Sequence, residues 1–186
     1  ICSPAFQRRV EALGGYSTEK TGTVVAVEAP AAVETAGQLR RGILTHRTRP
    51  GWRVIDHTAD IGIAVEAETL TALFEQAAEG LFSLIAAPRR RRGGRVTAVS
   101  AAGLDWPDLM FQWLRTLLFV WTGEARILSG VRVTAVAPYS IRGEIETEGY
   151  DPAVHTLGND IKAVTYHQLR VEKTGGRWRA QAIFDV

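Results

Sequence analysis

Acidic side chains interrupt a predicted β-strand between Arg53 and Ala67. Asp56, His57 and Asp60 stand where a strand would normally carry apolar residues. A buried carboxylate either takes up a proton or costs several kcal/mol of folding free energy unless a cation or a basic group accompanies it. Two carboxylates four residues apart therefore predict a bound cation or a basic partner.

The end of the sequence carries a second acidic pair. Alternation along the last strand puts two sets of side chains on opposite faces: Trp178, Ala180, Ala182 and Phe184 on one, and Arg179, Gln181, Ile183 and Asp185 on the other. Asp185 is followed only by Val186, which ends the chain with a carboxylate. Two neighbouring acids repel each other unless a cation lies between them, so this end also predicts a cation.

The preceding strand contains the segment KAVTYH, residues 162–167. Strict alternation would place Lys162, Val164, Tyr166 and Gln168 on one face and Ala163, Thr165, His167 and Leu169 on the other. If the last two strands pair, polar groups from both gather at one edge of the sheet. Considered by itself, Lys162 could equally be a surface lysine without a function. Considered by itself, His167 would be a half-buried histidine that is hydrogen-bonded to a neighbour.

The surrounding elements predict an α+β fold in which two helices pack on one largely antiparallel sheet. The first helix covers about 17 residues after Thr69, its expected N-cap, and Pro88 prevents its continuation. The second helix is capped by Asp105 and is expected to end at Gly123. Its apolar stripe is wide, which implies that it is covered on more than one side.

Composition narrows the class of protein. With 186 residues and 46% hydrophobic content, the chain predicts one domain at 51–186 and a weakly structured extension or fusion remnant at 1–50. No apolar run is long enough to span a bilayer and no secretory signal is recognisable, so we expect a soluble, cytoplasmic protein. The single cysteine leaves oxygen or imidazole ligands for any metal.

Four segments together resemble the archease family, whose members assist the RNA ligase of tRNA splicing. They are DHTADIGI (56–63), LFEQAAEGLF (73–82), KAVTYH (162–167) and the closing FDV, in the expected order and spacing over about 51–186. The resemblance implies a protein cofactor rather than an enzyme. Its partner would be the ligase that joins an RNA 3′-phosphate or 2′,3′-cyclic phosphate to a 5′-hydroxyl with GTP, and it would promote ligase guanylylation and multiple turnover.

The resemblance also implies a site. Archeases carry a divalent cation, often assigned as calcium, on positions that correspond here to Asp60, Asp185 and Val186, the last through its terminal carboxylate or carbonyl. Hard oxygen ligands suit calcium or magnesium, and manganese is also possible; Asp56 is a further candidate ligand. Lys162 corresponds to a functional lysine expected to contact the ligase or phosphate. His57 would orient a ligand, and His167 is a further functional candidate.

Two other functions stay open at this point. Acids, a histidine and a lysine around a cation are also the components of a metal-dependent phosphoesterase. The arginine run Arg89 to Arg92 is either a solvated loop or a phosphate contact, and the latter would suit a small RNA-binding module. The nearly balanced charge of residues 51–186 argues against a protein whose main function is to bind nucleic acid.

Overall fold

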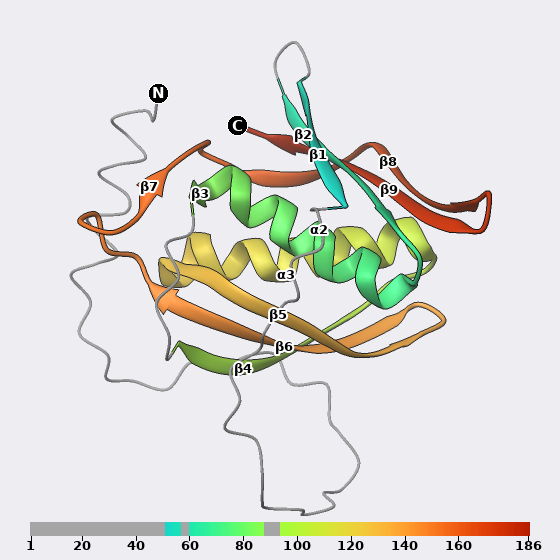
Figure 1. Ribbon diagram of the computed structural model, residues 1–186, viewed down its shortest axis with the longest axis horizontal. Helices are drawn as coiled ribbons and strands as arrows, with labels where there is room; N and C mark the ends of the chain where they lie inside the picture. The colour runs from blue at the N-terminus through green and yellow to red at the C-terminus, as the bar shows by residue number, and fades with distance from the viewer. Residues whose placement is uncertain (1–50, 57–59, 88–93) are drawn as a thin grey trace, which may run out of the picture.

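The computed structural model describes residues 51–56, 60–87 and 94–186 (Figure 1). In chain order, its elements are β1 (Trp52–Asp56), β2 (Ile61–Ala67), α2 (Leu70–Ile85), β3 (Ala86–Ala87), β4 (Arg95–Ala102), α3 (Trp106–Glu124), β5 (Arg126–Ala137), β6 (Ser140–Gly149), β7 (Thr156–Leu157), β8 (Ala163–Thr174) and β9 (Arg177–Asp185). The predicted extension 1–50 and the arginine run lie outside the described residues. Neither helix in the described ranges has the length and apolar character needed to cross a bilayer.

The two helices form a layer between two antiparallel sheets (Figure 1). One sheet has four strands in the order β1-β2-β9-β8, and the other has three in the order β4-β6-β5. Helix α2 packs against β2 and β5, and α3 packs against β8 and β4, so each helix touches both sheets. A short third pairing joins β3 to β7.

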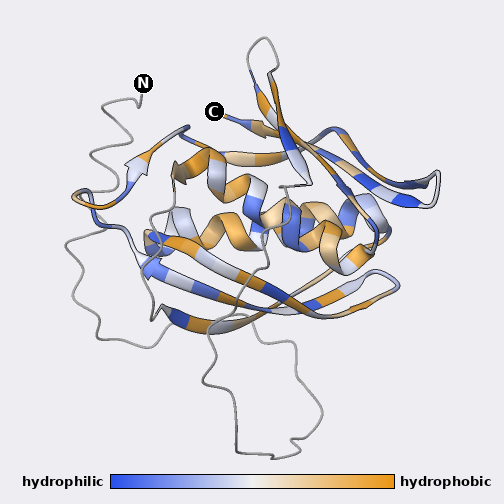
Figure 2. Cartoon of the chain, in the orientation of Figure 1, coloured by the Kyte–Doolittle hydropathy of each residue, from blue (hydrophilic) through white to orange (hydrophobic). Residues whose placement is uncertain are grey.

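The α+β class, the two helices and the antiparallel pairing confirm the prediction, but the strands do not form the single sheet that was expected. They divide over two main sheets because each helix is apolar on opposite sides and needs cover from both. Trp113, with no exposed surface, lies in this middle layer and donates its indole N–H to the carbonyl of Phe74 over 3.2 Å. Figure 2 shows the helices rich in apolar residues and the strands alternating between polar and apolar.

The helix starts follow the predicted capping residues. The Thr69 hydroxyl accepts the N–H of Ala72 at 3.1 Å, and the Asp105 carboxylate accepts the N–H of Asp108 at 2.7 Å. The end of α3 differs from the expectation, because Gly123 stays helical and Ala125 takes the left-handed conformation with φ 50°. The ring of Phe119 lies over Gly123 and would be 2.9 Å from a Cβ there, but this ring is 65% exposed and can move aside.

The β8–β9 hairpin turns at the predicted TGG segment. Gly175 and Gly176 both have positive φ values, 61° and 80°, which is the conformation of a two-residue turn that matches strand twist. Strict alternation in β8 was wrong, however. The register shifts between Thr165 and Arg170, and Gln168 has φ 53°. Because an irregularity of this kind reverses the alternation, Val164 and Val171 are both buried although they are seven residues apart.

Candidate functional site

The register of the four-stranded sheet brings Asp60 and Asp185 to the same end. Ile61 in β2 pairs with Phe184 in β9, and one step beyond this pair stand Asp60 on one side and Asp185 on the other. In Figure 1 the end of β9, marked C, lies beside β1 and β2. Two carboxylates separated by more than a hundred residues in the chain are therefore neighbours in the fold.

Strand alternation assigns both carboxylates to the same side of the sheet. In β9, Ala180, Ala182 and Phe184 are buried toward the helices, so Asp185 belongs to the opposite set and is exposed. In β2, Ile63 and Val65 are buried toward the helices, and alternation carried one step past Ile61 puts Asp60 on the other side. We call this side, turned away from α2 and α3, the outer face.

Lys162 and Val186 lie at this same end. The backbone N–H of Lys162 donates to the main-chain oxygen of Asp185 over 2.8 Å, and the next residue, Ala163, pairs with Asp185 in the sheet. The side chain of Lys162 is exposed. Val186 directly follows β9 and is 38% exposed. The backbone of Lys162 and the main chain of Val186 thus lie at the sheet end where Asp60 and Asp185 stand. Because Lys162 stands two residues before the buried Val164, its side chain leaves the strand on the helix side, opposite to Asp185.

The other candidates are placed less directly. Asp56, the last residue of β1, pairs with Ile61, so its backbone reaches the same sheet end. His57 lies outside the described residues. His167 is exposed on β8 beyond Thr165, which pairs with Ile183, so it stands farther along the strand than Lys162. The structure therefore brings Asp60, Asp185, Val186 and Lys162 to one place and leaves His167 away from it.

The donors at this sheet end fit a cation that prefers oxygen. Among the residues the structure describes, no group of three or more His, Cys, Asp or Glu side chains is close enough to hold a metal by itself. Calcium takes 6–8 oxygen ligands and accepts carboxylates, main-chain oxygens and water together. Asp60 and Asp185 would supply the charged ligands, and main-chain oxygens and water the rest.

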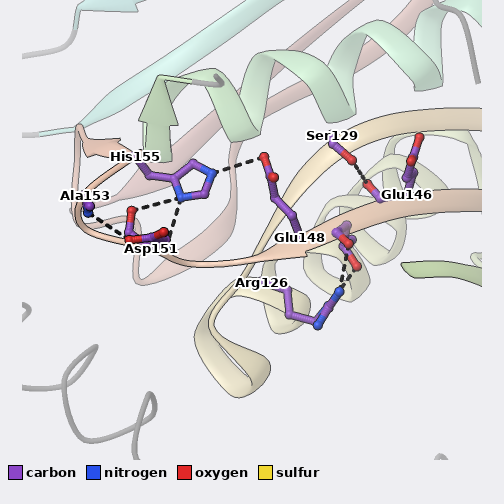
Figure 3. A network of polar contacts seen from close by, with 8 residues as sticks. Arg126, Ser129, Glu146, Glu148, Asp151, Ala153 and His155 are labelled. Atoms are coloured by element: carbon purple, nitrogen blue, oxygen red, sulfur yellow. Dashed lines mark hydrogen bonds and ion pairs between the residues drawn. The ribbon is translucent and has the colours of Figure 1, made fainter. Parts of the chain in front are cut away.

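A buried histidine organises the segment that leads to Lys162 (Figure 3). His155 is 4% exposed, and its Nδ1 accepts the backbone N–H of Asp151 over 3.0 Å. Its Nε2 lies 3.1 Å from a Glu148 carboxylate oxygen, and its Nδ1 also lies 3.2 Å from the Asp151 carbonyl oxygen. The Asp151 carboxylate in turn accepts the N–H of Ala153 at 2.9 Å. These bonds fix the chain just after β6.

The same segment then docks on the end of α2. The N–H groups of Gly158 and Asn159 donate to the carbonyls of Ile85 and Leu84 over 2.8 and 2.7 Å, which satisfies acceptors that a helix end leaves unpaired. A Cβ on Gly158 would lie 2.4 Å from the Leu84 carbonyl oxygen, so this approach requires glycine. His155 and Gly158 thus position Lys162, a role that the sequence did not indicate because their partners are set by tertiary contacts.

Comparisons with known proteins agree with this geometry. Residues 52–186 match the model of the Archease protein family. Two curated relatives, each named protein archease, come from Methanosarcina mazei and Methanopyrus kandleri. The first is 32% identical over 139 residues, which are 73% of this chain and 95% of the relative. The second is 33% identical over 138 residues, which are 73% of this chain and 99% of the relative.

Solved structures show the same fold. The solution structure of a Methanobacterium thermoautotrophicum protein aligns with a TM-score of 0.59 at 22% identity, over 74% of this chain and 99% of that one. The crystal structure of a Thermotoga maritima archease, described as a possible chaperone, aligns with a TM-score of 0.51 at 19% identity, over 76% of this chain and 100% of that one.

Proposed function

Because this chain belongs to the archease family, we propose that it activates the GTP-dependent RNA ligase that joins 3′-phosphate and 5′-hydroxyl RNA ends in tRNA splicing and RNA repair. In this role it promotes guanylylation of the ligase and allows multiple turnover. The observation that supports the proposal most directly is the meeting of Asp60 and Asp185 beside Lys162 at one end of the four-stranded sheet.

A divalent cation belongs to this proposal. Asp60, Asp185, a main-chain oxygen of Val186 and Asp56 would hold it, with calcium as the first choice and magnesium or manganese as alternatives. Two like-charged carboxylates brought together by the sheet register repel each other, and a cation between them removes that repulsion. When bound, the cation supplies positive charge and Lewis acidity at an exposed end of the protein.

Lys162 has a separate task in the proposed activator. Its exposed ammonium group lies on a backbone held by the bond to Asp185, so its position is tied to the carboxylate pair. An exposed lysine at the edge of the sheet end that carries both carboxylates adds a positive charge near that end. Such a surface suits contact with the ligase, or with a phosphate that the ligase holds.

Guanylylation of a cognate ligase tests the proposal. The ligase is mixed with GTP, manganese and this protein, and guanylylated ligase is followed over time. We expect acceleration by the wild type and a loss of about tenfold or more in Asp60→Asn and Asp185→Asn, since about 1.4 kcal/mol of barrier lowering corresponds to a factor of ten. The matched control is Glu68→Gln, a carboxylate 83% exposed just after β2, at the strand's other end. No acceleration by the wild type would contradict the proposal.

Cation binding is measured separately from activation. Calcium, magnesium and manganese are titrated into the isolated protein by calorimetry, for the wild type and for the same three variants. We expect binding to be lost in Asp60→Asn and Asp185→Asn and kept in Glu68→Gln. Activation that survives in variants unable to bind a cation would separate the activator role from the cation and refute only the latter.

A further inference from the structure

A groove of about 530 Å³ lies on the outer face of the four-stranded sheet, away from the carboxylate pair. Its centre is one continuous row across all four strands. Arg53 in β1 pairs with Ala64 in β2, Ala64 pairs with Gln181 in β9, and Gln181 pairs with Arg170 in β8. Two arginines on the outer strands therefore flank a small, neutral floor.

The four side chains of this row belong to the outer face. Trp52 and Val171, the neighbours of Arg53 and Arg170 in their strands, are on the helix side, because Trp52 lies near Gly80 of α2 and Val171 is buried in the core. Ala64 alternates with the buried Ile63 and Val65. Arg53 and Arg170 are exposed, and Ala64 and Gln181 are half-buried.

The charged side chains around the groove carry a net positive charge. Glu66 accepts Arg177 at 2.7 Å and Arg179 at 3.1 Å, and Glu172 stands opposite Arg179 in the register. Among the residues that line the groove, the three arginines Arg53, Arg170 and Arg179 exceed the two glutamates Glu66 and Glu172 by one charge. Within the described part of the chain, neither Arg53 nor Arg170 forms a salt bridge or a side-chain hydrogen bond. Among the described residues, the guanidinium groups of Arg53 and Arg170 therefore have no ion-pair partner, and the groove keeps a net positive charge.

The spacing of the strands lets both arginines serve one ligand. Neighbouring strands lie ~4.8 Å apart, so the Cα atoms of Arg53 and Arg170, three strand intervals apart, are separated by roughly 14 Å across the row. Two long side chains can reach inward from these positions and meet above the methyl group of Ala64. A larger residue at 64 would fill the space in which they meet.

We propose that this row binds a phosphate monoester, the group at a phosphorylated RNA end. A monoester carries a charge of about −1.5 to −2 and three terminal oxygens, which matches two guanidinium groups, each offering a fork of N–H donors. A single carboxylate has one charge and two oxygens, which one arginine fork satisfies. The match of charge and donor number therefore favours a phosphate monoester over an acidic peptide. This inference requires neither the cation nor the ligase.

Binding is tested on the full protein in the presence of EDTA, so that no metal bridges ligand and protein. The probes are a short single-stranded RNA with a 3′-phosphate, the same RNA with a 3′-hydroxyl, and inorganic phosphate as competitor. We expect the phosphorylated RNA to bind about tenfold or more tightly than its hydroxyl counterpart, and Arg53→Gln or Arg170→Gln to remove about tenfold each. Ala64→Glu, which puts a negative charge on the floor, should abolish the preference.

Control variants distinguish binding at this arginine row from nonspecific attraction of RNA to positive charge elsewhere on the protein. The double variant Arg115→Gln/Arg142→Gln removes two exposed arginines elsewhere and should bind as the wild type does. Thermal unfolding establishes that each variant is folded. Competition by inorganic phosphate supports a site for the phosphate itself, and binding of phosphorylated RNA without such competition supports a site that also needs the RNA strand.

Four results would overturn the proposal. They are no binding of either RNA or of phosphate, equal binding of the two RNAs, an equal loss in the Arg115→Gln/Arg142→Gln control, and displacement by a phosphate-free glutamate-rich peptide as effective as that by phosphate. Equal binding of the two RNAs would indicate contact with the phosphodiester backbone instead, and effective displacement by the peptide would indicate an acidic protein partner.

Discussion

The side chain of Tyr166, four residues after Lys162, joins β8 to α3. Its hydroxyl donates to the Asp108 carboxylate over 2.5 Å, and its ring stacks on Phe111 with centroids 3.9 Å apart. Asp108 also accepts the N–H of Leu104. The hydrogen bond from Tyr166, followed by that from Leu104, lowers the pKa of Asp108, and the same bond raises the pKa of Tyr166.

Replacing Tyr166 by phenylalanine tests this bond. We expect the pKa of Asp108 to rise toward its ordinary value of 3.8. A carboxyl whose pKa is lowered by folding stabilises the protein above its unfolded-state pKa, and this contribution disappears as the pH falls through the folded-state value. The wild type should therefore be more stable to unfolding than Tyr166→Phe at neutral pH, and this difference in stability should vanish in acid. Carboxyl carbon NMR shifts and urea unfolding at several pH values measure both effects; an unchanged Asp108 pKa would contradict the assignment.

The pKa of Glu75 is shifted in the opposite direction, upward. This half-buried carboxylate of α2 accepts the N–H of Val133 at 2.7 Å, but burial outweighs that bond and the charge of Arg132, so the pKa of Glu75 is raised above 4.5. Glu75→Gln keeps an acceptor and removes the buried charge. Because the pKa is raised in the folded state, wild-type stability relative to this variant should fall as the pH rises through the range above 4.5.

We therefore expect Glu75→Gln to be the more stable protein at neutral pH and the difference to disappear in acid. Denaturant unfolding at pH 4 and pH 7 measures it. Glu172→Gln, at an exposed position, is the control and should change stability little at either pH. A variant less stable than the wild type at neutral pH would show that the bond to Val133 outweighs burial.

At the level of elements, β2 and β9 approach each other closely beside the carboxylate pair. Gly62 pairs with Ile183, and a Cβ at 62 would lie 2.6 Å from the Ile183 Cδ1 and 2.8 Å from the Ala182 carbonyl oxygen. Ile183 has no exposed surface although alternation assigns it to the outer face. Gly62 thus provides the space in which Ile183 packs, one pair away from the proposed cation ligands.

Gly62→Ala should destabilise the protein by about 1–3 kcal/mol through overpacking. Ile183→Val removes the Cδ1 group and by itself should cost about 0.5–1.5 kcal/mol. Combined, the two changes should cost less than their sum, because the valine removes the contact of the new methyl group with Cδ1, while the contact with the Ala182 carbonyl oxygen remains. Chemical unfolding of the four proteins in the cycle measures the coupling, and strictly additive losses would mean that the two side chains do not compete for space.

At the scale of the whole molecule, the carboxylate pair and the arginine row lie on the same outer face of the four-stranded sheet. Asp185 stands four residues beyond Gln181 on β9, which at ~3.4 Å per residue separates the carboxylate pair from the arginine row by roughly 14 Å. The helices and the three-stranded sheet cover only the other side of these strands. Among the described elements, the negative end and the positive row therefore share the face that α2 and α3 do not cover.

A cation at the negative end should stabilise the whole fold. It would join the start of β2 to the end of β9, and a ligand that binds only the folded state adds about 2.7 kcal/mol at a hundredfold excess over its Kd. For a domain of this size we expect calcium to raise the Tm by roughly 5–10 °C and a chelator to reverse the rise. Scanning calorimetry measures it. Asp185→Asn should show no calcium effect, and an equal rise in that variant would place the cation elsewhere.

The sequence by itself determined what depends on neighbours along the chain. Thr69 and Asp105 begin their helices as predicted because capping requires only a side-chain oxygen three residues before a free N–H. Gly175 and Gly176 make the β8–β9 turn because only glycine readily takes positive φ at both positions. The alternation of β9 was also predictable, since a regular strand has a period of two.

Tertiary structure alone decided what depends on packing between distant segments. The division into two sheets, the register shift in β8 and the left-handed Ala125 follow from how the helices and strands fit together, for which local patterns carry no signal. The same holds for the burial of His155 and for the row that joins Arg53 to Arg170. Residues more than a hundred positions apart become neighbours only through strand register, because that register is set by the packed core rather than by any one strand.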